Sequence, residues 1–188
     1  MELIQRQEPQ LPTKIEDLAQ FVLVGRDKLA MVRAGIRALD KLDVAEGVRR
    51  QKKEEAQMLA EALLDAETRI GEILRQMPKA SGAHWEQKRE SKSNTAVTSN
   101  PQPTKQDAIE ELGFNKMQAS RFETLAANKD LVEEIKQQAR EADDLPTRTA
   151  VLQAVKWRDK MATMKKAEED KVRTMSAEVK HKPVIHVM

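Results

Sequence analysis

The segment from Thr104 to Leu125, TKQDAIEELGFNKMQASRFETL, constrains the fold more tightly than any other part of the chain. Thr104 precedes a helical run and has Asp107 three residues later, a spacing at which the two side chains can cap the first turn of a helix. Gly113 then supplies the positive φ that a helix-ending turn favours, and Asn115 can cap a second helix. The segment therefore predicts two short helices joined by a tight turn, a helix-turn-helix.

The second helix of this motif is predicted to present polar side chains outward. Ala119 and Phe122 have the spacing of an inward face, and Phe114 is predicted to fill the turn. Arginine and glutamine carry paired groups that match base edges in the DNA major groove, whereas lysine and serine suit phosphate oxygens. The predicted DNA-binding residues are Thr104, Asn115, Lys116, Gln118, Ser120 and Arg121.

A helical hairpin that does not touch DNA is the alternative for the same segment. Three basic side chains are opposed by four acidic ones between Thr104 and Leu125, so the motif is slightly acidic. In addition, Ala108 precedes Ile109 in the first helix, whereas helix-turn-helix motifs usually place the large apolar residue before the small one. Both hypotheses keep the same two helices and differ in what the outer surface contacts.

The composition favours a helical protein. Of the 188 residues, 34% are charged and only 3% are aromatic, a balance that suits helices rich in Ala, Leu, Lys and Glu. The absence of cysteine excludes disulfide bonds and thiol catalysis. Because the net charge is only +2, any contact with nucleic acid must come from a local basic patch. The longest apolar run, Phe21–Val24, is too short to span a membrane, and the start of the chain lacks the pattern of a signal peptide.

The first 78 residues predict three helices that form an assembly module. One helix is expected to begin after Pro12, a second to cover about residues 27–39, and a third to run from about residue 44 to Met77, before Pro78. The third helix carries apolar residues with the 4-3-4-3-4 spacing of a heptad seam, namely Leu59, Leu63, Ala66, Ile70, Ile73 and Met77.

This seam has two candidate partners, the two preceding helices or a second copy of the chain. Two heptads alone do not distinguish between them. Because a helix-turn-helix protein commonly binds paired half-sites, a homo-oligomer is expected, in its simplest form a dimer. The predicted oligomerisation residues are Leu59, Leu63, Ile70 and Ile73.

A change of composition separates the assembly module from the helix-turn-helix. Residues 79–103 are rich in Ser, Asn, Thr and Pro and are predicted to form a flexible linker. After the motif, a helix is expected over residues 130–140 and another from Thr147, with Trp157 in the core. The predicted fold is all-α, with an N-terminal helical bundle or coiled-coil module at 1–78, the linker at 79–103, a helix-turn-helix module at 104–160 and a polar helical extension at 161–188.

None of the short motifs that mark common active sites occurs in the chain. It has no glycine-rich phosphate loop, no zinc-protease helix and no nucleophile elbow. The three histidines, His84, His181 and His186, are too scattered to predict a metal site. We therefore expect a protein that is not an enzyme and that uses no metal and no cofactor.

Two stretches together resemble a group of uncharacterised helix-turn-helix proteins of phages and prophages. The first includes residues 66–74, AETRIGEIL, and the second is residues 112–122, LGFNKMQASRF. In that group, an Ala-Glu-x-Arg-x-Gly-Glu-Leu-Leu run is followed by a variable linker and a Leu-Gly-Ile-x-x-x-Gln-Ser-Ser-Arg helix-turn-helix. The departures are at Thr68, Ile73 and Ala119. The second stretch is also similar to the helix-turn-helix region of the partition protein ParB, but the chain lacks the nucleotide-binding arginine motif of that family.

The resemblance implies a DNA-associated protein of a phage or mobile element. The leading hypothesis is therefore sequence-specific binding of double-stranded DNA in the control of transcription, replication or partition. Such a protein would act in the cytoplasm of the bacterial host, at the nucleoid. The alternative hypothesis is a non-enzymatic adaptor or scaffold that binds a host or phage protein through its helical surfaces.

Overall fold

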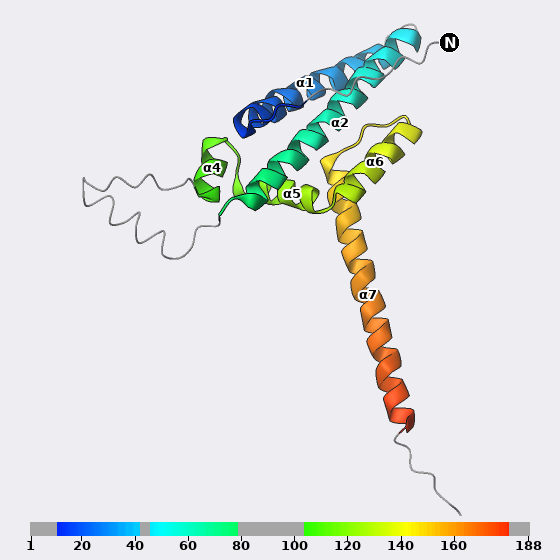
Figure 1. Ribbon diagram of the computed structural model, residues 1–188. Helices are drawn as coiled ribbons and strands as arrows, with labels where there is room; N and C mark the ends of the chain where they lie inside the picture. The colour runs from blue at the N-terminus through cyan, green and yellow to red at the C-terminus, as the bar shows by residue number, and fades with distance from the viewer. Residues whose placement is uncertain (1–10, 42–45, 79–103, 181–188) are drawn as a thin grey trace, which may run out of the picture.

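The computed structural model describes residues 11–41, 46–78 and 104–180, and every regular element in these ranges is a helix (Figure 1). This confirms the predicted all-α class. None of these helices is long and apolar enough to cross a membrane. The helices are α1 (Ile15–Lys41), α2 (Glu46–Gln76), α4 (Lys105–Glu111), α5 (Lys116–Ala127), α6 (Lys129–Glu141) and α7 (Arg148–Lys180).

α1 is one uninterrupted helix of 27 residues, where the sequence predicted two shorter ones. The predicted break is wrong because Gly25, in the middle of the helix, has a packing role. A Cβ on Gly25 would lie 2.7 Å from Cδ2 of Leu63, so the missing side chain makes room for Leu63. α1 and α2 consequently lie side by side as a long helical hairpin (Figure 1).

The predicted heptad seam of α2 is packed inside this chain. Leu59 and Leu63 lie in a cluster with Leu29 of α1, and Ile70 and Ile73 lie in a second cluster that includes residues of both α1 and α5. The sequence left open whether the seam packs on the preceding helices or on a second copy of the chain. In the structure it packs on helices of the same chain. Self-association through Leu59, Leu63, Ile70 and Ile73 stays a prediction.

The α4–turn–α5 segment packs on the α1–α2 hairpin. Ile109, Phe114 and Phe122 share one core cluster with Leu18 of α1 and Ile70 of α2. The described parts of the two predicted modules are therefore joined by a common core, and the predicted module boundaries stay predictions. The predicted linker lies outside the described residues, as do His84, His181 and His186.

α6 and the first turns of α7 pack on another side of α2. Val132 of α6 and Val151 of α7 share a cluster with Leu64 of α2. Val155 is the last buried residue of α7, and Arg158 still forms an ion pair with Asp130 of α6; from there α7 projects from the body as a single helix (Figure 1). Trp157 lies at the base of this projecting part and is 63% exposed. Its predicted place in the core is therefore wrong, because α7 contacts the body only through its first turns.

Candidate nucleic-acid interface

Thr104 starts α4 with the predicted cap. Its hydroxyl oxygen accepts a hydrogen bond from the backbone N–H of Asp107 at 3.4 Å. The Asp107 carboxylate accepts one in return from the backbone N–H of Thr104 at 3.2 Å. Because Thr104 is buried, its place in the structure is that of a cap that positions α4, not that of an outward side chain.

The turn between α4 and α5 has the hydrogen bonds of a Schellman motif. Gly113 has a φ of 75°, and its N–H donates to the carbonyl of Glu110 at 3.1 Å. The N–H of Phe114 donates to the carbonyl of Ile109 at 3.0 Å. The ring of Phe114 then meets the ring of Phe122 edge to face, with 5.1 Å between the ring centroids. The turn and this aromatic contact together set the direction in which α5 leaves the turn.

α5 begins with a reciprocal cap that involves two of the predicted DNA-binding residues. The backbone N–H of Gln118 donates to Oδ1 of Asn115 at 2.8 Å, and the backbone N–H of Asn115 donates to Oε1 of Gln118 at 2.9 Å. The side-chain carbonyl oxygen of Gln118 is therefore already hydrogen-bonded to the backbone at the start of α5. The spacing Asn-x-x-Gln is the signal in the sequence that predicts this role.

Three of the predicted DNA-binding residues, Lys116, Ser120 and Arg121, are exposed on α5. Met117 lies exposed beside them, and its sulfur accepts a hydrogen bond from Nη2 of Arg121 at 3.3 Å. A thioether is a weak acceptor. The guanidinium of Arg121 therefore keeps strong donors available for a ligand.

Two further arginines, neither of them predicted from the sequence, lie next to α5. The guanidinium carbons of Arg26 from α1 and Arg148 from α7 lie 5.6 and 6.0 Å from the ring centroid of Phe122. Both side chains also donate to Oε1 of Glu67, Arg26 at 2.7 Å and Arg148 at 3.3 Å. No local pattern could have linked them, because they are brought together by helices that are far apart in the sequence.

The arginine cluster, defined as Arg26, Arg121 and Arg148, carries more positive charge than the buried Glu67 neutralises. Burial lowers the pKa of Arg148, and the charges of Arg26 and Arg121 lower this pKa further, against the opposing effect of Glu67. Arg121 is therefore close enough to Arg148 for their charges to repel. A local excess of positive charge with exposed donors suits an anionic ligand such as a phosphate.

The acidic side chains of this region gather around α4. Asp107 caps the start of α4, and Glu110 and Glu111 are exposed at its end. Glu123 of α5 forms an ion pair with Lys105 of α4, so these two charges neutralise each other. The small acidic excess counted in the sequence is therefore concentrated near α4, and the exposed part of α5 that contains Lys116 and Arg121 stays basic.

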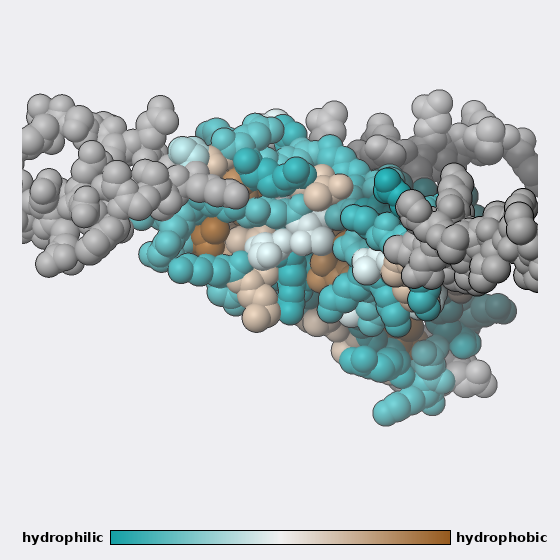
Figure 2. Space-filling view, turned by 90° about the horizontal axis from the view of Figure 1, so that it is seen from below, coloured by the Kyte–Doolittle hydropathy of each residue, from teal (hydrophilic) through white to brown (hydrophobic). Residues whose placement is uncertain are grey.

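The side of the molecule on which α5 lies is largely hydrophilic. Figure 2 views the molecule from below and shows a mostly hydrophilic face with apolar residues scattered among the hydrophilic ones. Continuous apolar patches are the usual mark of a hydrophobic protein interface. This face is therefore better suited to a polar or charged ligand.

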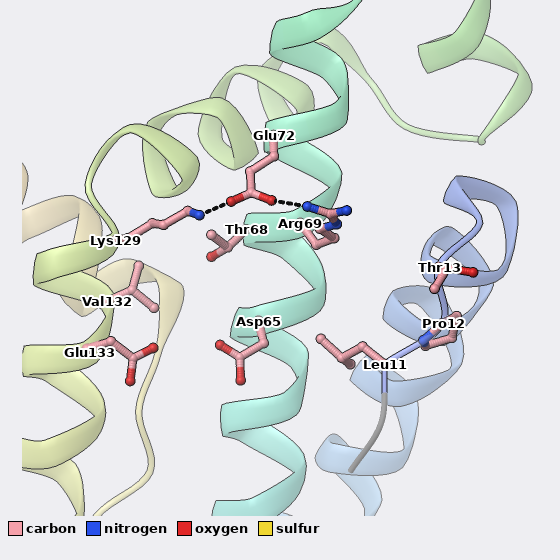
Figure 3. A pocket seen from close by; sticks show the side chains of 10 residues that line it. All are labelled: Leu11, Pro12, Thr13, Asp65, Thr68, Arg69, Glu72, Lys129, Val132 and Glu133. Carbon is pink, nitrogen blue, oxygen red and sulfur yellow. Dashed lines mark hydrogen bonds and ion pairs between the residues drawn. The ribbon is translucent and has the colours of Figure 1, made fainter. Parts of the chain in front are cut away.

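A groove of about 420 Å³ lies between α2, α6 and the segment 11–13 (Figure 3). Glu72 at its wall forms ion pairs with both Lys129 and Arg69, the latter at 2.7 Å. Hydrogen bonds from Lys129 and Arg69 lower the pKa of the Glu72 carboxyl group. The Glu72 carboxylate is therefore satisfied by neighbouring helices. The part of the chain that the structure describes also holds no group of three or more side chains suited to bind a metal ion.

Comparison with known proteins gave no match to this chain. No family model matches it, and no curated protein and no solved structure was found to be similar to it. The geometry around α5 is therefore the basis for the function proposed below.

Proposed function

We propose that α4 and α5 are a helix-turn-helix and that the protein binds double-stranded DNA through α5. The observation that carries this proposal is the exposure of Lys116, Ser120 and Arg121 on α5, together with the positive charge that Arg26 and Arg148 add at Phe122 of the same helix. A duplex would meet the exposed side of α5, and the arginines from α1 and α7 would lie along its phosphate backbone. The resemblance to phage and prophage helix-turn-helix proteins supports the same class of function.

The exposed residues have different expected roles. Arg121 has a planar guanidinium that can donate two hydrogen bonds to one guanine. Lys116 lies in the first turn of α5, where the free backbone N–H groups and the helix dipole also favour a phosphate. The caps formed by Thr104, Asn115 and Gln118 would hold α4 and α5 in the binding geometry.

The biological role that we propose is control of transcription, replication or partition for a phage or mobile element. The protein would then act at the nucleoid, in the cytoplasm of a bacterial host. A homodimer belongs to this proposal, because helix-turn-helix proteins commonly bind paired half-sites related by a two-fold axis.

The test is a binding titration of the whole chain on a duplex selected from a random DNA pool and on a scrambled duplex, each at two salt concentrations. Arg121→Ala should weaken binding to the selected duplex by about 1–3 kcal/mol and relax one base position. Lys116→Ala should weaken binding to both duplexes and reduce the salt slope by about one unit.

Arg50→Ala is the matched control for these variants. Arg50 is exposed at the start of α2, roughly 30 Å along this helix from Gly71, where α5 packs. Its replacement therefore removes the same charge far from α5. This control should bind DNA like the parent. If the Arg121 and Lys116 variants also bind both duplexes like the parent, α5 does not contact DNA.

A second candidate function, an adaptor that binds another protein, is favoured by the projecting part of α7. Trp157, Met161 and Met164 are exposed and recur four and three residues apart, so they form one apolar stripe. Lys160 and Lys165 lie beside this stripe. An aromatic anchor on a helix is typical of recognition by a groove on a partner protein. If the chain passes unretained through a DNA column at low salt, this second function is favoured over the first.

A further inference from the structure

The outer face of α1, which points away from α2, is apolar and exposed. Met31 is 74% exposed and Val24 is 60% exposed, and these two residues are one heptad apart. Leu23 is exposed beside them. Small exposed residues continue the same face toward the end of the helix, namely Ala30, Ala34, Gly35 and Ala38.

α1 is therefore apolar on both sides, which is unusual for a surface helix. Eight consecutive residues, 18–25, carry no charge. Leu18, Val22 and Leu29 are buried in the core clusters shared with α2, so they account for the inner side only. A helix that is apolar all round is normally covered all round, and an exposed apolar face marks an interaction site.

The two ends of α1 carry opposite charges. Glu16 and Asp17 are exposed in the first turn, and Arg37 and Lys41 are exposed toward the end, where the charge of Asp40 is paired with Arg49 of α2. None of these four side chains forms an ion pair with another described residue. Two α1 helices that lie antiparallel would place the acidic end of each against the basic end of the other. Their helix dipoles would also be opposed, which is favourable.

The middle of α1 is self-complementary in the same way. Asp27 and Lys28 are adjacent, exposed and at the centre of the helix. In an antiparallel pair whose two-fold axis passes between residues 27 and 28, Asp27 of one copy is level with Lys28 of the other, and the ends of the two helices are offset by one residue. Val24 of one copy then lies near Met31 of the other, so the largest exposed apolar side chains cover each other.

We propose that two copies of this chain associate through the outer faces of their α1 helices, as an antiparallel pair with two-fold symmetry. A two-fold interface uses the same patch on both partners, and this face meets that requirement. At 1.5 Å per residue, the contact would be about 40 Å long. This interface differs from the predicted seam of α2, whose Leu59 and Leu63 already pack toward α1.

The apolar stripe of α7 is less suited to self-association. Lys160 and Lys165 both lie next to Trp157, Met161 and Met164. Pairing two such stripes would bring lysines together in either orientation, and like charges repel. The self-complementary charges of α1 therefore favour α1 as the contact between two copies.

The test is sedimentation equilibrium of the whole chain without DNA, so that its outcome is independent of DNA binding. The parent should behave as a dimer. Met31→Glu and Asp27→Lys should each raise the dissociation constant at least tenfold, because each places an unmatched charge in the contact. The double variant Asp27→Lys with Lys28→Asp should restore association, since it exchanges the two charges across the axis. Circular dichroism of each variant checks that the helices are intact.

Met164→Glu is the matched control, because it makes the same kind of change at an exposed methionine of α7. It should leave the dimer intact. A parent chain that is monomeric at high concentration would overturn the proposal. So would a dimer that Met164→Glu dissociates and Met31→Glu does not. Failure of the charge exchange to restore association would overturn the antiparallel arrangement.

Discussion

Gly71 of α2 and Phe122 of α5 meet backbone to backbone. A Cβ placed on Gly71 would lie 2.0 Å from the carbonyl oxygen of Phe122 and 2.4 Å from its carbonyl carbon. No side chain fits in this space, so the contact requires a glycine at this point of α2. It joins the α1–α2 hairpin to α5 and thereby holds the proposed DNA-binding helix on the body of the protein.

Gly71→Ala is expected to destabilise the protein by about 3 kcal/mol, because α2 and α5 must move apart to admit the methyl group. Helix propensity alone predicts the opposite sign, a gain of about 1 kcal/mol for alanine. Gly47→Ala is the control, since nothing lies within 4 Å of a Cβ at Gly47, and it should leave stability unchanged or raise it. Denaturant unfolding measures both. Equal stability changes for the two variants would contradict the close contact.

Gln118 is expected to contribute to stability as well as to any binding. Gln118→Ala removes the acceptor for the Asn115 backbone N–H and should cost about 0.5–1 kcal/mol of unfolding free energy. Gln118→Glu keeps that acceptor and places a negative charge at a helix start, so it should unfold like the parent. The same charge should weaken DNA binding. A stable Gln118→Ala variant would show that the cap contributes nothing.

Glu67 is expected to be the residue on which the packing of Arg26 and Arg148 depends. It is buried and accepts hydrogen bonds from both arginines. Glu67→Gln leaves the two cations without a counter-charge and should cost about 2–3 kcal/mol, below the range for a fully buried pair because both arginines are partly exposed. Adding Arg148→Met should recover part of the loss. A double-mutant cycle measures this coupling, and strictly additive costs would exclude it.

Glu72 is expected to make stability depend on pH on the acidic side. Lys129 and Arg69 lower its pKa in the folded state below the ordinary value of 4.5. The contribution is therefore complete above that value and is lost as the pH falls through the lowered pKa of the folded state. Glu72→Gln should cost about 0.5–1 kcal/mol at neutral pH, since Lys129 is exposed, and the difference from the parent should vanish at low pH. A difference that is independent of pH would rule out the ion pairs as its cause.

Trp157→Ala is expected to change the free energy of unfolding by less than about 0.5 kcal/mol, because the indole is exposed on the projecting part of α7. Phe122→Ala provides the contrast, since its fully buried ring should cost about 3–5 kcal/mol. Thermal unfolding of the two variants compares them directly. A large loss of stability on removing Trp157 would mean that the indole has a partner within the chain.

Features that depend on near neighbours in the chain could be predicted from the amino-acid sequence. Thr104 and Asp107 cap α4, Gly113 has the positive φ of the turn, and Ala119 and Phe122 point inward. Each of these features requires only residues within about one turn of one another. The helical class follows in the same way, from composition and from the spacing of the apolar residues along each helix.

Which helix faces contact one another is known only from the folded protein. The α2 seam packs on α1, and Arg26 and Arg148 lie over the ring of Phe122. Trp157 lies outside the core. A periodic apolar pattern predicts that one face of a helix is buried, but it does not identify the helix that packs against that face. That choice depends on packing between helices distant in sequence, as at Gly71 and Phe122, where the fit of two backbones excludes every side chain.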